Sequence, residues 1–138
     1  MRAVLYQAAV NTSAIAVSST NTLGVTLTHN AGAEWTIERF AISYNGASPL
    51  QAGALIALYD SQHNRFLLPG YCSLGALGFP RSGSAVLAAA PALLRELVYP
   101  VTLKAGQSMQ LFVTTDNATS FAANDLCLLM HGYQDVAG

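Results

Sequence analysis

Three histidines are the first residues to weigh for chemistry, because imidazole binds metal ions and moves protons near neutral pH. They lie far apart in the chain, at His29, His63 and His131. A metal site readable from sequence normally has closely spaced ligands, and the chain has no His-x-His pair and no Glu-x-x-His. The spacing therefore predicts no metal and no cofactor. We expect His29 to face water at a strand end and His131 to be satisfied by a neighbour in the last strand.

The carboxylates do not form the pair that glycoside hydrolysis needs, in which two acids face each other across a cleft. Glu34 and Glu38 are the closest in sequence. We expect the first at a solvated strand end and the second in a bulge, paired with Arg39. Three aspartates are expected to form turns, since the Asp side chain bonds its own backbone; they are Asp60, Asp116 and Asp125.

The two cysteines, Cys72 and Cys127, have no base or cation beside them in the sequence. Neither is therefore expected to be a nucleophile, which needs a stabilised thiolate. A disulfide between them and two reduced thiols both stay open as alternatives. Neither the cysteines nor the histidines and carboxylates described above support an enzymatic function.

Two further features, a glycine-rich segment and a set of aromatic residues, suggest binding rather than catalysis. Residues 75–83 are glycine-rich but match no phosphate-binding loop, because no alternating strand leads directly into them and no capped helix follows. Their Phe79 and Arg81 are of the types that anchor protein interfaces; the alternative is a loop folded onto its own domain. Aromatic residues could also form a sugar-stacking platform, but those within alternating strands are expected in the core: Trp35, Tyr44, Tyr59 and Tyr99.

The composition of the 138 residues excludes several classes of protein. Charged residues make up 9% and hydrophobic ones 52%, with a net charge of -1, whereas an ordinary soluble domain is about 25% charged. Disorder and electrostatic nucleic-acid binding are excluded, and no apolar run reaches the ~20 residues of a membrane helix. A monomer would carry about one charge per 530 Å² of surface, against about one per 200 Å² at average composition. We therefore expect much of the surface to be buried against other subunits.

Alternation of apolar and polar residues predicts strands along most of the chain. Residues 23–29 alternate strictly, so their three apolar side chains, Leu23 first, are expected on one buried face. Residues 34–44 change phase at Glu38-Arg39. A continuous strand cannot bury both sets on one face, so the slip predicts a bulge or a bend between two sheets.

The last third of the chain alternates most clearly. Residues 97–103 and 109–113 flank Ala105-Gly106, which predicts a β-hairpin. Pro100 places the first of these strands at an edge or a bulge. A helical turn and an extended connection both stay open for residues 84–94, which are alanine-rich but contain Pro91. Two runs that are apolar on both faces are expected to be central strands; they span residues 52–59 and 125–133.

These strands predict an all-β fold, an antiparallel β-sandwich of jelly-roll type with about seven or eight strands. Residues 23–138 are expected to form one domain. Residues 1–22 are expected to be a tail or an extended arm that adds a strand to a neighbour's sheet. The arm is favoured because its apolar residues need a partner; they are Val4, Leu5, Tyr6 and Val10.

The chain resembles the jelly-roll decoration or cement proteins of tailed-bacteriophage heads and the related head-fibre bases. The features that carry the resemblance are the low charge, the strand spacing, the uncharged N-terminal segment and the entry to the strand pair at residues 99–107. The likeness covers residues 23–133 and rests on fold and surface style. It implies a trimer on a capsid lattice, hence a structural protein of a virion assembled in the host cytoplasm, bound to the major capsid protein or another virion protein. The alternative function is a carbohydrate- or receptor-binding β-sandwich.

Overall fold

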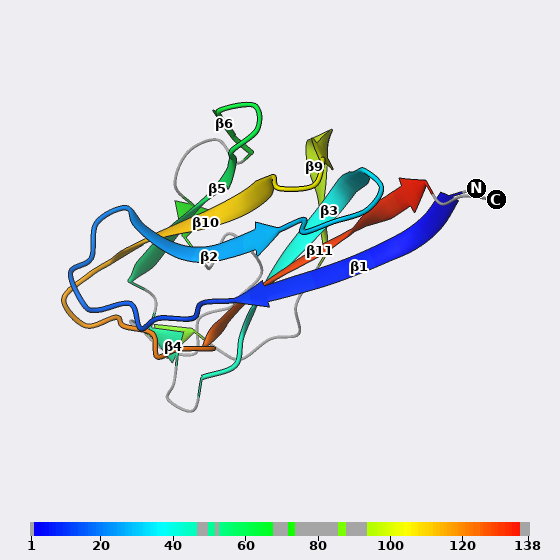
Figure 1. Ribbon diagram of the computed structural model, residues 1–138. Coiled ribbons are helices and arrows are strands. Elements are labelled where there is room, and N and C mark those ends of the chain that lie inside the picture. Colours follow the sequence, from blue (N-terminus) through cyan, green and yellow to red (C-terminus); the bar gives the residue numbers. More distant parts are fainter. Residues whose placement is uncertain are drawn as a thin grey trace.

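The computed structural model describes residues 2–46, 50–51, 53–67, 72–73, 86–87 and 94–135. Within them the chain forms strands and no helix. Two antiparallel sheets face each other, and both termini lie at the same end of the molecule (Figure 1). The strands are β1 (Arg2–Val10), β2 (Thr22–Thr28), β3 (Trp35–Tyr44), β4 (Leu50–Gln51), β5 (Ala54–Asp60), β6 (Arg65–Phe66), β7 (Cys72–Ser73), β8 (Val86–Leu87), β9 (Arg95–Leu103), β10 (Ser108–Thr115) and β11 (Leu126–Asp135).

The strand order is that of a jelly roll. One sheet has four strands in the order β1-β11-β3-β9, and the other has five, β2-β10-β5-β6, with β7 also paired to β5. Early strands pair with late ones in a nested series, β1 with β11, β2 with β10 and β3 with β9. This nesting is what a long antiparallel hairpin produces when it rolls up into two sheets. The predicted fold class is confirmed.

The core lies between the sheets and is filled by the inward side chains of both. Buried and partly exposed residues alternate strictly along β10, and they alternate in β11 from Leu126 to Gly132. Both are central strands, as is β5, which pairs with β10 on one side and with β6 and β7 on the other. The central positions predicted for β5 and β11 are confirmed.

A bulge interrupts β3 where the sequence changes phase. His131 pairs with Arg39 and Gly132 with Ile37, so Glu38 is the extra residue. Ile37 and Phe40 are both buried, although their positions differ in parity, and Glu38 is exposed. The bulge allows both halves of β3 to face the core, which confirms the predicted slip.

A second bulge, at Gly24 of β2, was not expected. Leu111 pairs with Val25 and Phe112 with Leu23, which leaves Gly24 without a partner. The extra residue reverses the parity, so Leu23 lies on the outer face and is exposed while Val25 is buried. The expectation that Leu23 faces the core is therefore wrong.

The expected hairpin in the last third is also wrong. β9 belongs to the four-stranded sheet and β10 to the five-stranded sheet, so the short connection crosses from one layer to the other. Gly106 there has a φ of +91°, and its N–H donates to the carbonyl of His29. Alternation and a short glycine loop predict two adjoining strands, but they do not distinguish pairing within a sheet from packing between sheets. Pro100 lies on an edge strand, as predicted.

The first 22 residues differ from the expected arm, because they form part of the sandwich itself. β1 pairs with β11 of the same chain over nine residues in unbroken register. Leu5 and Ile15 are buried in the core. The apolar residues of this segment thus find their partner within the chain, and no boundary at residue 22 separates an arm from a domain. Within residues 84–94, the two residues that form β8, Val86 and Leu87, are extended.

None of the described residues forms a helix with the length and hydropathy that crossing a membrane requires.

Candidate functional site

The outward side of the four-stranded sheet carries a group of uncharged side chains near β1, which we call the outer apolar face. The Arg39–Glu96 ion pair lies further across the same side of the sheet, in the row of Tyr6 and His131. Because paired residues share a face, the register places Ala8, Leu129 and Ala41 side by side across β1, β11 and β3. Val4 and Tyr6 lie beside them on β1 and are 70% and 66% exposed. The exposed members of the face are Val4, Tyr6, Ala8 and Val10 of β1 and Leu94 before β9, whereas Leu129 of β11 is half-buried and Ala41 of β3 is buried.

A hollow of about 320 Å³ opens on this face. Its lining includes Tyr6, Ala8, Ala41, Leu94 and Leu129, and none of its lining residues is charged. The Tyr6 ring packs against that of His131, with their centroids 4.7 Å apart. A hollow of this size and chemistry suits an apolar or aromatic side chain.

The only charged residue of β1 is Arg2, at the start of the strand. Arg2 lies 4.0 Å from the carboxylate of Asp135 and 4.2 Å from the centroid of the Tyr133 ring. Both charged side chains are strongly exposed, so this ion pair contributes little to stability. The one cation of β1 is thus at its first position, and the rest of the strand is uncharged from Ala3 to Val10.

The structure separates the residues that the sequence singled out for contact. Val4, Tyr6 and Val10 point outward on one face and are exposed. Leu5 points inward and belongs to the core, because neighbouring residues in a strand face opposite sides. Phe79 and Arg81 lie outside the described residues, as does the whole glycine-rich segment 75–83.

A second cluster, at the turn between β5 and β6, was missed in the sequence. Asp60 is fully buried, and its carboxylate lies 2.6 Å from Nδ1 of His63 and 3.4 Å from Nε of Arg65. Asp60 also accepts a hydrogen bond from the N–H of Gln62, the turn-forming role that was predicted. His63 and Arg65 follow Asp60 at three and five residues, and this spacing was the available signal.

Aromatic rings continue this cluster on the outward side of the five-stranded sheet. Tyr59 packs against Phe66 and Phe112, with ring centroids 5.2 and 6.1 Å apart. Its hydroxyl hydrogen-bonds the side chain of Asn64. Phe66 is 52% exposed, so one aromatic surface stands free beside the polar groups of the turn.

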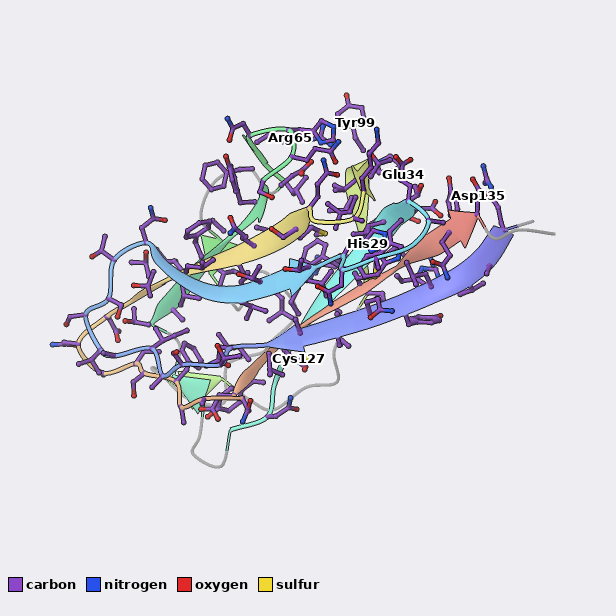
Figure 2. All side chains as sticks on the ribbon, in the orientation of Figure 1. His29, Glu34, Arg65, Tyr99, Cys127 and Asp135 are labelled. Atoms are coloured by element: carbon purple, nitrogen blue, oxygen red, sulfur yellow. The ribbon has the colours of Figure 1, made fainter. Side chains whose placement is uncertain are left out.

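Two histidines differ from their predicted roles. His29 is fully buried between the sheets (Figure 2), stacked on Trp35 with centroids 4.0 Å apart. Its Nε2 donates to the carbonyl of Ala33 at 2.7 Å. The alternation of its strand continues into the core, which overrides the polar character that suggested a strand end. His131 is in β11 as expected, but its Nδ1 has no hydrogen-bond partner among the described residues.

The structure also places one of the two cysteines and one of the aromatic residues considered above. Cys127 is a free thiol, half-buried on β11. Tyr99 stands out from β9 and is exposed (Figure 2), so it is not the core residue that its alternating strand suggested. Among the described ranges, no group of three His, Cys, Asp or Glu residues lies close enough together to hold a metal ion.

Two side chains near the end of β10 and the start of β11 have shifted pKa values. The side chain of Thr119 and the N–H of Ala118 favour the ionised form of Asp116 and hold the pKa of that carboxyl below its usual value. Burial, helped by the charge of Asp125, raises the pKa of Tyr44. Neither shift lies on the outer apolar face.

The fold defines the chain as a jelly-roll β-sandwich, and its four-stranded sheet carries an exposed apolar patch beside β1. No family model matches the chain, and no curated protein does. Among solved structures, it is similar to a chain in the structure of infectious bursal disease virus, Gx strain, with 13% identity and a TM-score of 0.33. The likeness covers 99% of this chain and 38% of the viral one, so the present chain spans well under half the length of that relative.

Proposed function

We propose that the chain is a structural protein of a virion and that it associates with further protein subunits through the outer apolar face. The observation that carries the proposal is the exposure of Val4 and Tyr6 beside an apolar hollow in a chain with 9% charged residues. Exposed apolar surface of this kind marks sites of protein association. The jelly roll is also one of the architectures from which viral capsids are built.

The mechanism is mass action. A protein that binds the assembled shell, and not its separated parts, stabilises the shell by an amount that grows with the logarithm of its free concentration relative to its dissociation constant. Within this class, the resemblance stated above favours a decoration or cement protein of a tailed bacteriophage. The trimer that this resemblance implies is an alternative to the two-fold pairing argued below, and the solution mass distinguishes the two.

The experiment is to purify particles on a density gradient from a culture that carries the gene and to identify their proteins by mass spectrometry. The chain is expected in the particle fraction at a fixed ratio to the major shell protein. Its complete absence from particles that contain every other shell component would contradict the proposal.

A second candidate, a carbohydrate-binding module, is favoured by the β5–β6 turn. Phe66 offers an exposed ring beside the polar side chains of His63 and Arg65, and sugars are bound by such combinations of ring and hydrogen-bonding groups. A glycan array probed with the wild type, Phe66→Ala and Tyr99→Ala tests it. Binding that is lost only in Phe66→Ala would support this candidate, because Tyr99 is an even more exposed ring on a different strand.

A further inference from the structure

We infer that the free edge of β1 pairs antiparallel with the same edge of a second copy of this chain, which joins two four-stranded sheets into one continuous sheet. The inference deepens the proposed function and rests on it, because it names the partner of the same surface. Three observations carry it: the open backbone groups of β1, the absence of a proline, bulge or charge along residues 3–10 of this strand, and the symmetry of the strand.

The open backbone groups can be assigned from the register. The N–H of Asn11 donates to the carbonyl of Leu126, and β1 continues from there in unbroken antiparallel register with β11. Hydrogen-bonded and non-bonded positions alternate in such a pair. Every second residue of β1 therefore turns its N–H and C=O away from β11: Arg2, Val4, Tyr6, Ala8 and Val10.

These residues also carry the side chains of the outer apolar face. A partner strand that pairs with their backbone would lie beside Val4, Tyr6 and Val10 and cover part of their exposed surface. Among the described residues, the only strand hydrogen-bonded to β1 is β11. One edge and one face are thus open together along nine residues.

The other described sheet edges are protected against pairing. β9 contains Pro100, a charged start and a shifted register. β2 has the Gly24 bulge, and β6 and β7 are two residues long. Prolines, charges, bulges and short strands are the devices by which natural sheets avoid edge-to-edge contact. β1 is long and regular, with no proline and with one charge at its end.

The strand is also compatible with itself. Antiparallel pairing about a two-fold axis with full overlap of the nine residues places Tyr6 opposite Tyr6 of the second copy and Val4 opposite Ala8. Arg2 then lies opposite Val10, so the two cations are at opposite ends of the contact. Such a self-complementary patch is what a closed two-fold dimer requires.

The experiment measures mass by light scattering across a hundredfold range of concentration, with Ala8→Pro and Tyr6→Lys as test variants. The Ala8 N–H points away from β11, so Ala8→Pro removes a donor from the open edge and leaves the bonds of the chain's own sheet in place. Tyr6→Lys puts a charge on the symmetry axis. Each is expected to weaken the dimer at least tenfold with the fold retained, as shown by thermal unfolding.

Two controls separate edge pairing from general damage. Ala9→Pro removes a bond to β11, and it is expected to lower the unfolding temperature. Thr26→Lys adds the same charge to an exposed position of β2, and it is expected to leave the dimer intact. If Ala8→Pro unfolds the protein, Tyr6→Lys still decides the question.

A wild type that stays monomeric at every concentration would overturn the inference. So would a trimer with no two-fold contact, or an oligomer that both test variants leave unchanged. In these cases the chain's presence in purified particles decides separately whether the proposed function survives. A dimer that depends on Tyr6 and Ala8, in a chain absent from particles, would keep the edge pairing and reject the virion role.

Discussion

Gly132 of β11 packs directly under the backbone carbonyl of Thr36 in β3, so closely that a Cβ added to the glycine would lie 1.8 Å from that oxygen. The contact is at the bulge made by Glu38, where the two strands change register. Gly132→Ala is therefore expected to destabilise the fold by about 3 kcal/mol or more, because backbone atoms of two central strands would have to move apart. Urea unfolding measures the loss.

Gly24→Ala provides the matched control, since Gly24 also lies at a bulge. A Cβ there would meet Cγ2 of Val113 at 3.0 Å and Cδ1 of Ile15 at 3.2 Å. These are ends of side chains that can shift, so the expected cost is about 1 kcal/mol. Equal losses in the two variants would show that the Thr36 carbonyl is not the limiting contact.

Asn11 is expected to matter as much as a large core residue. It is fully buried. Its Nδ2 donates to the carbonyls of Ser13 and Ala122, and its Oδ1 accepts from the N–H of Leu126 at 2.8 Å. Asn11→Ala leaves these backbone groups unsatisfied, and we expect a loss of about 3 kcal/mol in the free energy of unfolding.

Asn117→Ala is the control for Asn11→Ala, because Asn117 is exposed and surface changes usually stay within about 0.5 kcal/mol. Urea midpoints of both variants against the wild type give the comparison. A loss below about 1 kcal/mol for Asn11→Ala would mean that water replaces the amide without cost.

Acid stability is expected to depend on Asp116. The pKa of this carboxyl is lowered in the folded chain from its ordinary value of 3.8, so the folded state binds a proton less readily than the unfolded one. Its stabilising contribution is complete above pH 3.8 and is lost as the pH falls below that value toward the folded pKa.

Asp116→Asn tests this dependence, because asparagine can still accept from the N–H of Ala118 but carries no charge. The variant is expected to be less stable than the wild type at pH 6, and the two should converge as the pH falls below 3.8. Chemical unfolding at several pH values measures the difference. A gap that is unchanged down to pH 2 would contradict the assignment.

Local patterns in the sequence predicted the strands well, because each strand's alternation is fixed by its own residues. The slip at Glu38-Arg39 was readable for the same reason, since one strand cannot bury two phases without a bulge. Pro100 restricted β9 to an edge or a bulge, and the strand lies at an edge. These features need no knowledge of what lies across the sheet.

Features that depend on distant partners were not predictable in this way. β9 and β10 alternate like a hairpin, but the choice between one sheet and two is made by β3 and β2, which compete for their edges. Leu23 is turned outward by a bulge that becomes visible only against Leu111 and Phe112. The inclusion of β1 in the sandwich depends on β11, more than a hundred residues later.

The candidate surface was predicted in part. Val4, Tyr6 and Val10 are apolar in a segment without an evident partner, which predicts contact residues, and the structure leaves them exposed. The parity that sends Leu5 into the core follows from the strand once its register is known. The Asp60 cluster was not predicted, because the turn between β5 and β6 brings the buried carboxylate together with the His63 imidazole and the Arg65 guanidinium, and no pair of adjacent residues signals that contact.

Association through the outer apolar face is expected to depend weakly on salt. Residues 3–10 of β1 carry no charge, so the contact brings few ions together and screening has little to weaken. Between low salt and about 0.5 M NaCl, the dissociation constant should change by less than about threefold. Light scattering at both salt concentrations measures it, with Arg2→Ala as a control for the one cation of β1. A loss of affinity of tenfold or more in the wild type, reproduced without salt by Arg2→Ala, would show that the contact is electrostatic and that the apolar face is not its main source.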